Sequence, residues 1–163
     1  MTPQKDNPEN EESYRFIASC HKAEECALRL IARAEQNTPG LTIKLERKHF
    51  EPAVIKEVIS GLLERGLLND ERYAVLWLRS SLAKQVQSPK WLLLSLRKRG
   101  IDRKSSKKAL EEVLDPETEY TLLLKYAEKP KKTPKNREKP PLRTVLKYEG
   151  FSVESIDRYF DLF

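Results

Sequence analysis

The sequence predicts an all-α protein made of three tandem three-helix repeats that form an elongated, solenoid-like rod, either straight or curved. The 163-residue chain has only 5 Gly and is rich in Leu, Lys, Glu and Arg, a composition that favours helices. Leucines recur in pairs four residues apart, which places both members of a pair on one helical face. This pattern returns with a period of about fifty residues, which is typical of repeat proteins.

The repeat is visible when Phe50, Ile101 and Phe151 are taken as equivalent positions. Apolar residues then occupy the same places before and after them in every copy. The shared positions are Leu41, Leu92 and Leu142; Leu45, Leu96 and Leu146; Val58, Ala109 and Tyr159; Ile59, Leu110 and Phe160; and Leu62, Val113 and Phe163. Because a single unit of this length is marginally stable, neighbouring copies are expected to pack together.

The period divides the chain into an acidic N-terminal segment and three repeats. Residues 1–20 are expected to form a disordered acidic tail, because their first part combines Asp and Glu with Pro and Asn and carries a single Lys. The repeats are expected at 21–68, 69–114 and 115–163. The third repeat contains a Lys/Pro-rich loop at 129–141, for which two interpretations remain: a solvated linker, or a basic clamp that becomes ordered on DNA.

Capping residues indicate where the helices begin and end. The predicted starts are Thr38-Pro39, Pro52, Ser88-Pro89, Asn69-Asp70, Asp102, Asp115, Pro140-Pro141 and Ser152. Gly100 and Gly150 stand one residue before the equivalent positions, where a left-handed helix cap is most easily made by glycine. The first copy has His49 at this place, a poorer but tolerable residue.

The titratable and soft side chains do not form a recognisable catalytic or metal-binding pattern. Cys20 and Cys26 are expected to be reduced and to pack as small apolar residues. Their spacing around His21 suggests zinc, but His49 is the only further soft candidate, so no metal or other cofactor is expected. Glycine-rich phosphate loops are absent from the sequence. We therefore expect binding, and not catalysis.

The apolar runs are far shorter than the ~20 residues that a membrane-spanning helix needs. The N-terminus also lacks the basic-then-apolar pattern of a secretion signal. These features predict a cytoplasmic protein that makes no contact with a membrane and is a monomer.

The net charge of +6 is concentrated in the middle of the chain, where residues 84–108 carry nine basic side chains against one acid. Such a band attracts polyanions or acidic protein surfaces. The candidate interface residues are Lys90, Trp91, Arg97, Lys98, Arg99, Arg103 and Lys104, with Lys44, Arg47 and Lys48 at the equivalent place in the first copy. The alternative is that the basic band is only a solvent-exposed face. Cations near a helix C-terminus stabilise the helix even when they bind no partner.

Several segments resemble the RecX family of regulatory proteins, which modulate the RecA recombinase. The strongest is the hallmark segment Gly-Leu-Leu-Asn-Asp-Glu-Arg-Tyr-Ala at residues 66–74, and the segment around Gly150 and Phe151 resembles the family's C-terminal motif. The motif residues to which we assign a structural role are Gly66, Leu67, Asp70, Arg72, Tyr73, Ala74, Gly150 and Phe151. Asp70 and Arg72 are expected to cap the helix and to orient the junction between the first two copies.

The resemblance implies a non-enzymatic protein that lies along the RecA filament on single-stranded DNA and contacts RecA, with the DNA strand as a further partner. It also implies inhibition of ATP hydrolysis, strand exchange and co-protease activity. Two other functions remain open from the residues themselves. One is a general basic DNA-binding protein of helix-turn-helix type, and the other is an interaction scaffold without a nucleic-acid role.

Overall fold

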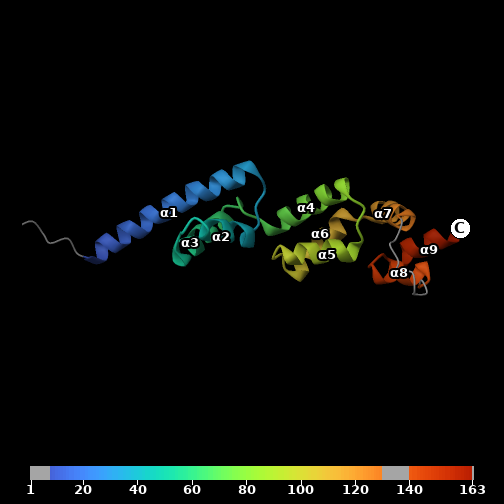
Figure 1. Cartoon of the computed structure of the whole chain (residues 1–163). Helices are drawn as coiled ribbons and strands as arrows, with labels where there is room; N and C mark the ends of the chain where they lie inside the picture. Colours follow the sequence, from blue (N-terminus) through green and yellow to red (C-terminus); the bar gives the residue numbers. More distant parts are fainter. Residues whose placement is uncertain (1–7, 130–139, 163) are drawn as a thin grey trace, which may run out of the picture. The chain divides into compact units, whose positions relative to one another are not determined.

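The computed structural model describes residues 8–129 and 140–162, and within these residues it contains α-helices and no strands (Figure 1). The all-α prediction is confirmed. The helices are α1 (Pro8–Arg33), α2 (Thr38–Glu46), α3 (Pro52–Glu64), α4 (Asp70–Lys84), α5 (Pro89–Lys98), α6 (Arg103–Val113), α7 (Pro116–Glu128), α8 (Leu142–Tyr148) and α9 (Val153–Asp161). Their contacts divide the chain into two compact units, Met1–Tyr73 and Ala74–Phe163. The grouping into three repeats stays a prediction.

The first unit consists of the long helix α1 packed against α3 and α2 (Figure 1). Its core is formed by small residues of α1 and by aliphatic residues of the two shorter helices. The buried members are Ala23, Ala27, Leu41, Leu45, Val54, Ile55, Val58, Ile59, Leu62 and Leu68. Cys20 and Cys26 pack at the edge of this core as half-buried free thiols.

The expected disordered tail over residues 1–20 is wrong from Pro8 onward, because α1 begins there. Proline is favourable in the first turn of a helix, and no Gly or Pro follows it within α1. Glu11 and Arg15 form an i,i+4 ion pair of 3.5 Å on the exposed surface. The acidic composition therefore lies on a solvated helix, while residues 1–7 lie outside the described part of the chain.

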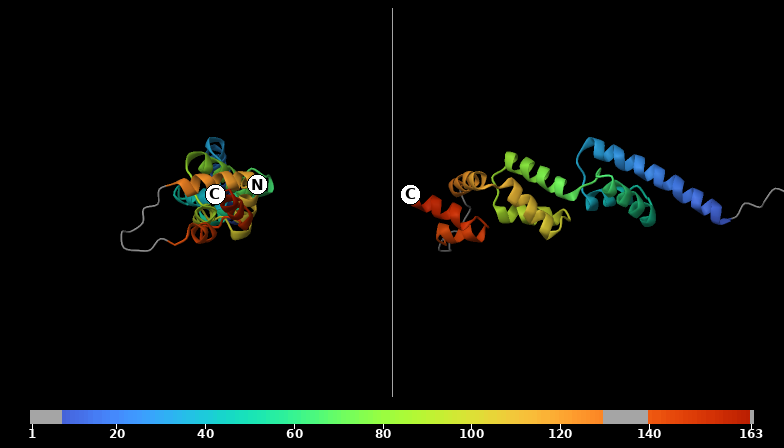
Figure 2. Two further views of the ribbon diagram at one scale, coloured as in Figure 1. Left: turned by 90° about the vertical axis from the view of Figure 1, so that its right-hand side faces the viewer. Right: turned by 180° about the vertical axis from the view of Figure 1, so that it is seen from behind.

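The second unit contains α5 packed on α6, and α9 packed on both α7 and α8 (Figure 2). One cluster of its core joins α7, α8 and α9 through Leu122, Leu123, Leu146, Phe151 and Ile156. The buried aliphatic residues of α4, α5 and α6 include Ala74, Leu78, Leu92, Leu96, Ala109 and Leu110. The predicted Leu pairs are thus central to the packing.

The same left-handed turn closes α2, α5 and α8. His49, Gly100 and Gly150 have φ angles of 63°, 82° and 87°. In each turn the next residue donates its amide hydrogen to the carbonyl of a leucine five residues earlier, in the pairs Phe50–Leu45, Ile101–Leu96 and Phe151–Leu146. This is the backbone geometry expected of a Schellman-type cap, and it confirms the predicted helix ends.

Most of the predicted helix starts are confirmed. Ser88, Asp102, Asp115 and Ser152 each accept a hydrogen bond from a backbone amide of the helix that follows. The exception is Thr38. Asn37 caps α2 instead, because its Oδ1 accepts from Gly40 N at 3.1 Å.

Candidate binding surface on helices α5 and α6

The predicted basic band occupies the end of α5 and the start of α6. The short turn at Gly100 and the Asp102 cap bring the last turn of one helix and the first turn of the next together. All of the cations that we predicted here are exposed: Arg97, Lys98, Arg99, Arg103 and Lys104. The α5 members lie in the last turn and at the C-cap, where positive charge is favourable beside the free carbonyls.

An aromatic pair lies beside these cations. Trp77 of α4 and Trp91 of α5 stack with ring centroids 6.5 Å apart and an interplanar angle of 23°. The guanidinium of Arg99 lies 4.2 Å from the centroid of the Trp77 ring, within cation–π range. The Trp91 side chain remains 46% exposed, whereas Trp77 is half-buried. Trp91 is therefore a surface residue that packs against a half-buried one.

The first turn of α5 is fixed against the end of α8. Ser88 Oγ donates to Glu149 at 2.5 Å, and Lys90 N donates to the Glu149 carbonyl at 3.0 Å. The ammonium of Lys90 lies 3.2 Å from the centroid of the Tyr148 ring. Lys90 is thus held by a ring and is not a freely moving surface cation.

A groove of about 790 Å³ runs between α5, α6 and the turn after α8. Leucines form its floor, among them Leu93, Leu94 and Leu110. The cations along it are Lys90, Arg97, Arg103 and Lys107. Lys98 and Lys104, which neighbour Arg97 and Arg103 in the sequence, are not part of its lining. The acids Glu111 and Glu119 also line it, and Glu111 pairs with Lys107 at 3.6 Å. The groove thus combines apolar leucines with four cations and two acids, a combination that suits protein side chains.

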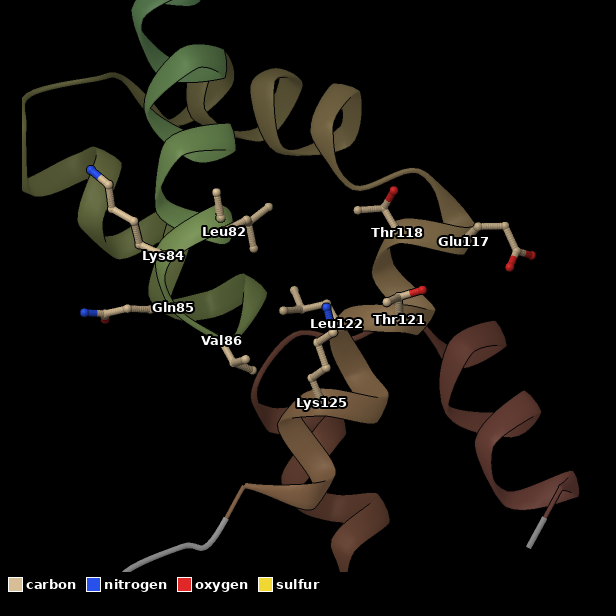
Figure 3. Close-up of a pocket in the computed structure, with 10 residues that line it drawn as sticks. Leu82, Lys84, Gln85, Val86, Glu117, Thr118, Thr121, Leu122 and Lys125 are labelled. Carbon is tan, nitrogen blue, oxygen red and sulfur yellow. The ribbon is translucent and has the colours of Figure 1, made fainter.

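A second hollow of about 480 Å³ lies between the end of α4 and the exposed side of α7 (Figure 3). Leu82, Val86 and Leu122 meet there, while Glu117 points away from them. Leu82 and Val86 also pack against the core cluster of α7, α8 and α9. Six of its ten lining residues are polar, among them Thr118, Thr121 and Lys125, so the hollow is a crevice of mixed character beside the core.

The candidate cations of the first copy lie in the other compact unit. Lys44 donates from Nζ to Gln36 Oε1 at 2.6 Å, so it is anchored to the loop before α2. Arg47 is exposed at the C-cap of α2. Lys48 lines a hollow of about 470 Å³ with three cations of α1: Lys22, Arg29 and Arg33.

The hallmark segment forms the junction between α3 and α4. Arg72 donates to the carbonyls of Gly66 and Leu67 at 3.1 and 3.2 Å. Asp70 Oδ1 accepts from Thr38 N at 2.6 Å, which ties the start of α4 to the start of α2. The cap of α4 is made by Asn69, whose side chain accepts from Arg72 N at 2.9 Å.

The remaining motif residues serve the turn and the packing. Gly66 has a φ of 66°, and its neighbour Leu67 is exposed. Tyr73 is half-buried and Ala74 is fully buried. Gly150 forms the turn after α8, and Phe151 is buried against the Tyr126 ring at 5.4 Å.

Two of the titratable groups with a shifted pKa are aspartates that cap helices. The pKa of Asp115 is lowered by hydrogen bonds from Thr118, and that of Asp102 by hydrogen bonds from Ser105. Burial raises the pKa of the Cys20 thiol, with a smaller contribution from the charge of Glu57. No group of three or more metal-ligating side chains occurs in the described residues. Among the same residues, no helix is long and apolar enough to cross a membrane.

The sequence interpretation missed the role of Trp77, Tyr148 and Glu149 at this surface. Trp77 had the spacing of a core residue, and its partner Trp91 stands fourteen residues later, beyond a loop. The one signal that could have drawn attention to the pair is that the chain has two Trp residues and both lie near its basic region.

These features define a helical protein with a cationic, partly aromatic surface and an amphipathic groove. No model of a known protein family matches the chain. The regulatory protein RecX of Treponema pallidum subsp. pallidum is 34% identical over 114 residues, which cover 70% of this chain and 70% of that protein. The regulatory protein RecX of Caldanaerobacter subterraneus is 29% identical over 154 residues, which cover 93% and 77% of the two chains.

Solved structures agree with these relatives. The crystal structure of RecX from Lactobacillus salivarius superimposes with a TM-score of 0.67 at 25% identity, over 90% of this chain and 99% of that one. A second crystal structure of a regulatory protein RecX shares the fold, with a TM-score of 0.72 at 19% identity, over 99% of this chain and 81% of that one. The chain belongs to the RecX family of regulatory proteins.

Proposed function

We propose that this protein binds the RecA filament on single-stranded DNA and modulates its activities, mainly by inhibiting ATP hydrolysis, strand exchange and co-protease function. It acts by binding, as a cytoplasmic monomer without a cofactor. The observation that carries this proposal, beside the family membership, is the surface of α5 and α6. There, exposed cations lie beside an aromatic pair and an apolar groove.

The composition of this surface suits a partner that is both protein and nucleic acid. The cations of the basic band lower the free energy of binding to phosphates, and they release counterions when they do so. The leucine floor of the groove offers area for apolar side chains of a protein, which bare DNA does not provide. A nucleoprotein filament presents both kinds of surface.

The alternative function is a general basic DNA-binding protein of helix-turn-helix type. It is favoured by the arrangement of α5 and α6, two short helices joined by a tight turn at Gly100. The exposed cations Arg103, Lys104 and Lys107 lie at the start of the second helix, where such proteins contact DNA.

The deciding experiment is the single-stranded-DNA-dependent ATPase of the cognate RecA, titrated with the full chain. We expect inhibition at or below one protein per RecA monomer. The same chain is titrated against duplex DNA at several salt concentrations. Unchanged ATPase together with tight, sequence-dependent duplex binding would replace the proposed function by the alternative. A triple charge reversal at Arg97, Arg99 and Lys104 should weaken inhibition if the basic band participates.

A further inference from the structure

We propose that Trp91 is a stacking platform for an unpaired nucleotide base, held in position by Trp77 and Arg99. The proposal deepens the proposed function, since it names one contact to a single strand. It is tested on bare oligonucleotide, without RecA, so that the stacking proposal and the proposed function can fail independently of each other. The ligand class is single-stranded nucleic acid, bound through base stacking and not through a base sequence.

The first argument is the exposure of a large aromatic ring. Trp91 is 46% exposed, although stacked aromatic pairs in a helical protein usually lie in the core. Every nucleobase has a π-face, and exposed aromatic rings in single-strand-binding proteins use such faces without sequence preference. The free surface of Trp91 is therefore chemically suited to an unpaired base.

The second argument is that the platform is held rigidly before any ligand binds. The backbone of Trp91 is fixed at the start of α5, because its amide donates to the capping Ser88 Oγ at 3.3 Å. Ser88 is in turn fixed by Glu149. The Trp77 ring limits the rotamers of Trp91 from α4. A side chain that is already ordered loses little conformational entropy on binding.

The third argument is the charge beside the rings. Arg99 donates from Nη1 to the Ser95 carbonyl at 2.8 Å, and the same guanidinium lies over Trp77. Lys98 follows Trp91 by seven residues, about 10 Å along the same face of α5, and is exposed. A strand whose base stacks on Trp91 can thus place neighbouring phosphates near two cations.

A peptide is the less suitable occupant for this place. Protein side chains are favoured by the neighbouring groove, because leucines dominate its apolar lining. Tyr148 is the one aromatic ring of that lining, and the Lys90 ammonium lies over it at 3.2 Å. Trp91 does not line that groove. The stacked tryptophans are therefore separate from the leucine groove that suits protein side chains.

The experiment uses the intrinsic fluorescence of the full chain, because Trp77 and Trp91 are its only two tryptophans. The probes are oligothymidine and an abasic oligonucleotide of the same length, which keeps the phosphates and lacks the bases. We expect oligothymidine to quench the emission and to bind at least about tenfold more tightly than the abasic strand, as the loss of base stacking predicts.

The variants separate stacking from charge. Trp91→Leu should weaken oligothymidine binding about tenfold and leave abasic binding unchanged, while Trp91→Phe should retain most of the affinity. Because these variants alter the reporter, affinity is measured by the anisotropy of a labelled strand. Leu76→Ala is the matched control, since Leu76 is 44% exposed on α4, lies outside the groove lining and is expected to bind like the unsubstituted chain. Circular dichroism checks that each variant is folded.

Two results would overturn the proposal. One is equal affinity for oligothymidine and the abasic strand, and the other is unchanged oligothymidine binding by folded Trp91→Leu. Either result together with normal RecA inhibition would leave the proposed function standing. Conversely, Trp91-dependent binding of oligothymidine by a chain that leaves the RecA ATPase unchanged would support the platform and contradict the proposed function.

Discussion

Arg72 contacts Glu35 through an ion pair of 2.7 Å, while the same guanidinium donates to the carbonyls of Gly66 and Leu67 in the turn after α3. One side chain of α4 thereby fixes both the loop after α1 and the turn after α3. Carbonyls of a turn lie outside the helical hydrogen-bond pattern and need donors, and arginine supplies several donors in one plane. The hallmark arginine is thus a structural residue of the α3–α4 junction.

We predict that Arg72→Ala lowers the free energy of unfolding by about 1–2 kcal/mol. This is the usual contribution of hydrogen bonds to a charged group, reduced because the Arg72 side chain is partly exposed to solvent. Arg72→Lys should lose most of the same stability, because a single ammonium cannot reach all three acceptors. Urea unfolding followed by circular dichroism measures both. Arg79→Ala is the control, since Arg79 makes one exposed pair with Glu112. Equal effects of Arg72→Ala and Arg79→Ala would contradict the assignment.

The backbone of the three equivalent turns leads to a second prediction. Gly150→Ala should destabilise the chain by about 1–2 kcal/mol, because its φ is 87° and an added Cβ would lie 3.4 Å from Lys90 N. His49→Gly should stabilise the chain by about 0.5–1 kcal/mol. His49 has a φ of 63°, and this left-handed conformation is unfavourable for a residue with a Cβ but not for glycine. Thermal unfolding measures both changes.

Gly61→Ala provides the control for these turn variants. Gly61 lies within α3, and nothing is found within 4 Å of its added Cβ. We expect stabilisation of about 0.5–1 kcal/mol from helix propensity. A loss of stability for His49→Gly would contradict the idea that the first turn is a strained version of the other two.

The sequence alone predicted those turns because their cause is local. A left-handed residue after a leucine-bearing helix recurs at the same register, so His49 could be placed by comparison with Gly100 and Gly150. Thr38 was placed wrongly because the neighbouring Asn37 is also a good capping residue and makes the cap. The bond of the Thr38 amide to Asp70, which stands 32 residues away, has no signal in the sequence. The helical start of α1 was missed because composition indicated disorder, whereas α1 itself contains no Gly or Pro after Pro8.

The candidate site was predictable only in part, for the same reason. Clustered charges within residues 84–108 identified the basic band directly. The pairing of Trp77 with Trp91 and the holding of Lys90 by Tyr148 depend on how separate helices pack. No spacing rule within one helix connects such residues. Local patterns thus found the charges, and the tertiary structure was needed to find the rings beside them.

The two aspartate caps predict acid sensitivity. Hydrogen bonds from Ser105 and Thr118 lower the pKa of Asp102 and Asp115 below the usual value of 3.8. A carboxyl with a lower pKa in the folded state stabilises the fold at pH values above about 4, and this stabilisation is lost as the pH falls through the folded-state pKa. We therefore expect the melting temperature to fall on acidification below about pH 4.

The double variant Asp102→Asn and Asp115→Asn should be less sensitive to this acidification. Asparagine keeps the capping acceptor but does not titrate in this range. The measurement is the melting temperature between about pH 7 and about pH 2.5, a range that spans the carboxyl titration. Asp161→Asn, an exposed residue at the end of α9, is the control and should behave like the unsubstituted chain. A double variant that loses as much stability in acid as the control would show that the caps do not carry the effect.

The last prediction concerns the groove of α5 and α6. Arg97 and Arg103 line it, and no ion pair to an acid is found for either within the described residues. If the groove contacts the RecA filament, acidic groups of the partner should lie opposite Arg97 and Arg103. The double variant Arg97→Glu and Arg103→Glu then places two negative charges opposite these acids. We expect inhibition of the RecA ATPase to require at least about tenfold more protein, as the loss of close charge pairs predicts.

The matched control is Lys98→Glu together with Lys104→Glu. Each lysine neighbours one of the two arginines, is exposed, and lies outside the groove lining. Both double variants change the net charge by the same amount, so a long-range attraction to a polyanion would be weakened equally in both. A direct contact in the groove weakens inhibition more in the arginine pair than in the lysine pair, and the difference persists at high salt, where long-range attraction is screened. If both double variants lose inhibition equally, and both losses disappear as the salt concentration rises, the surface acts only through long-range charge. The groove would then not contact the filament.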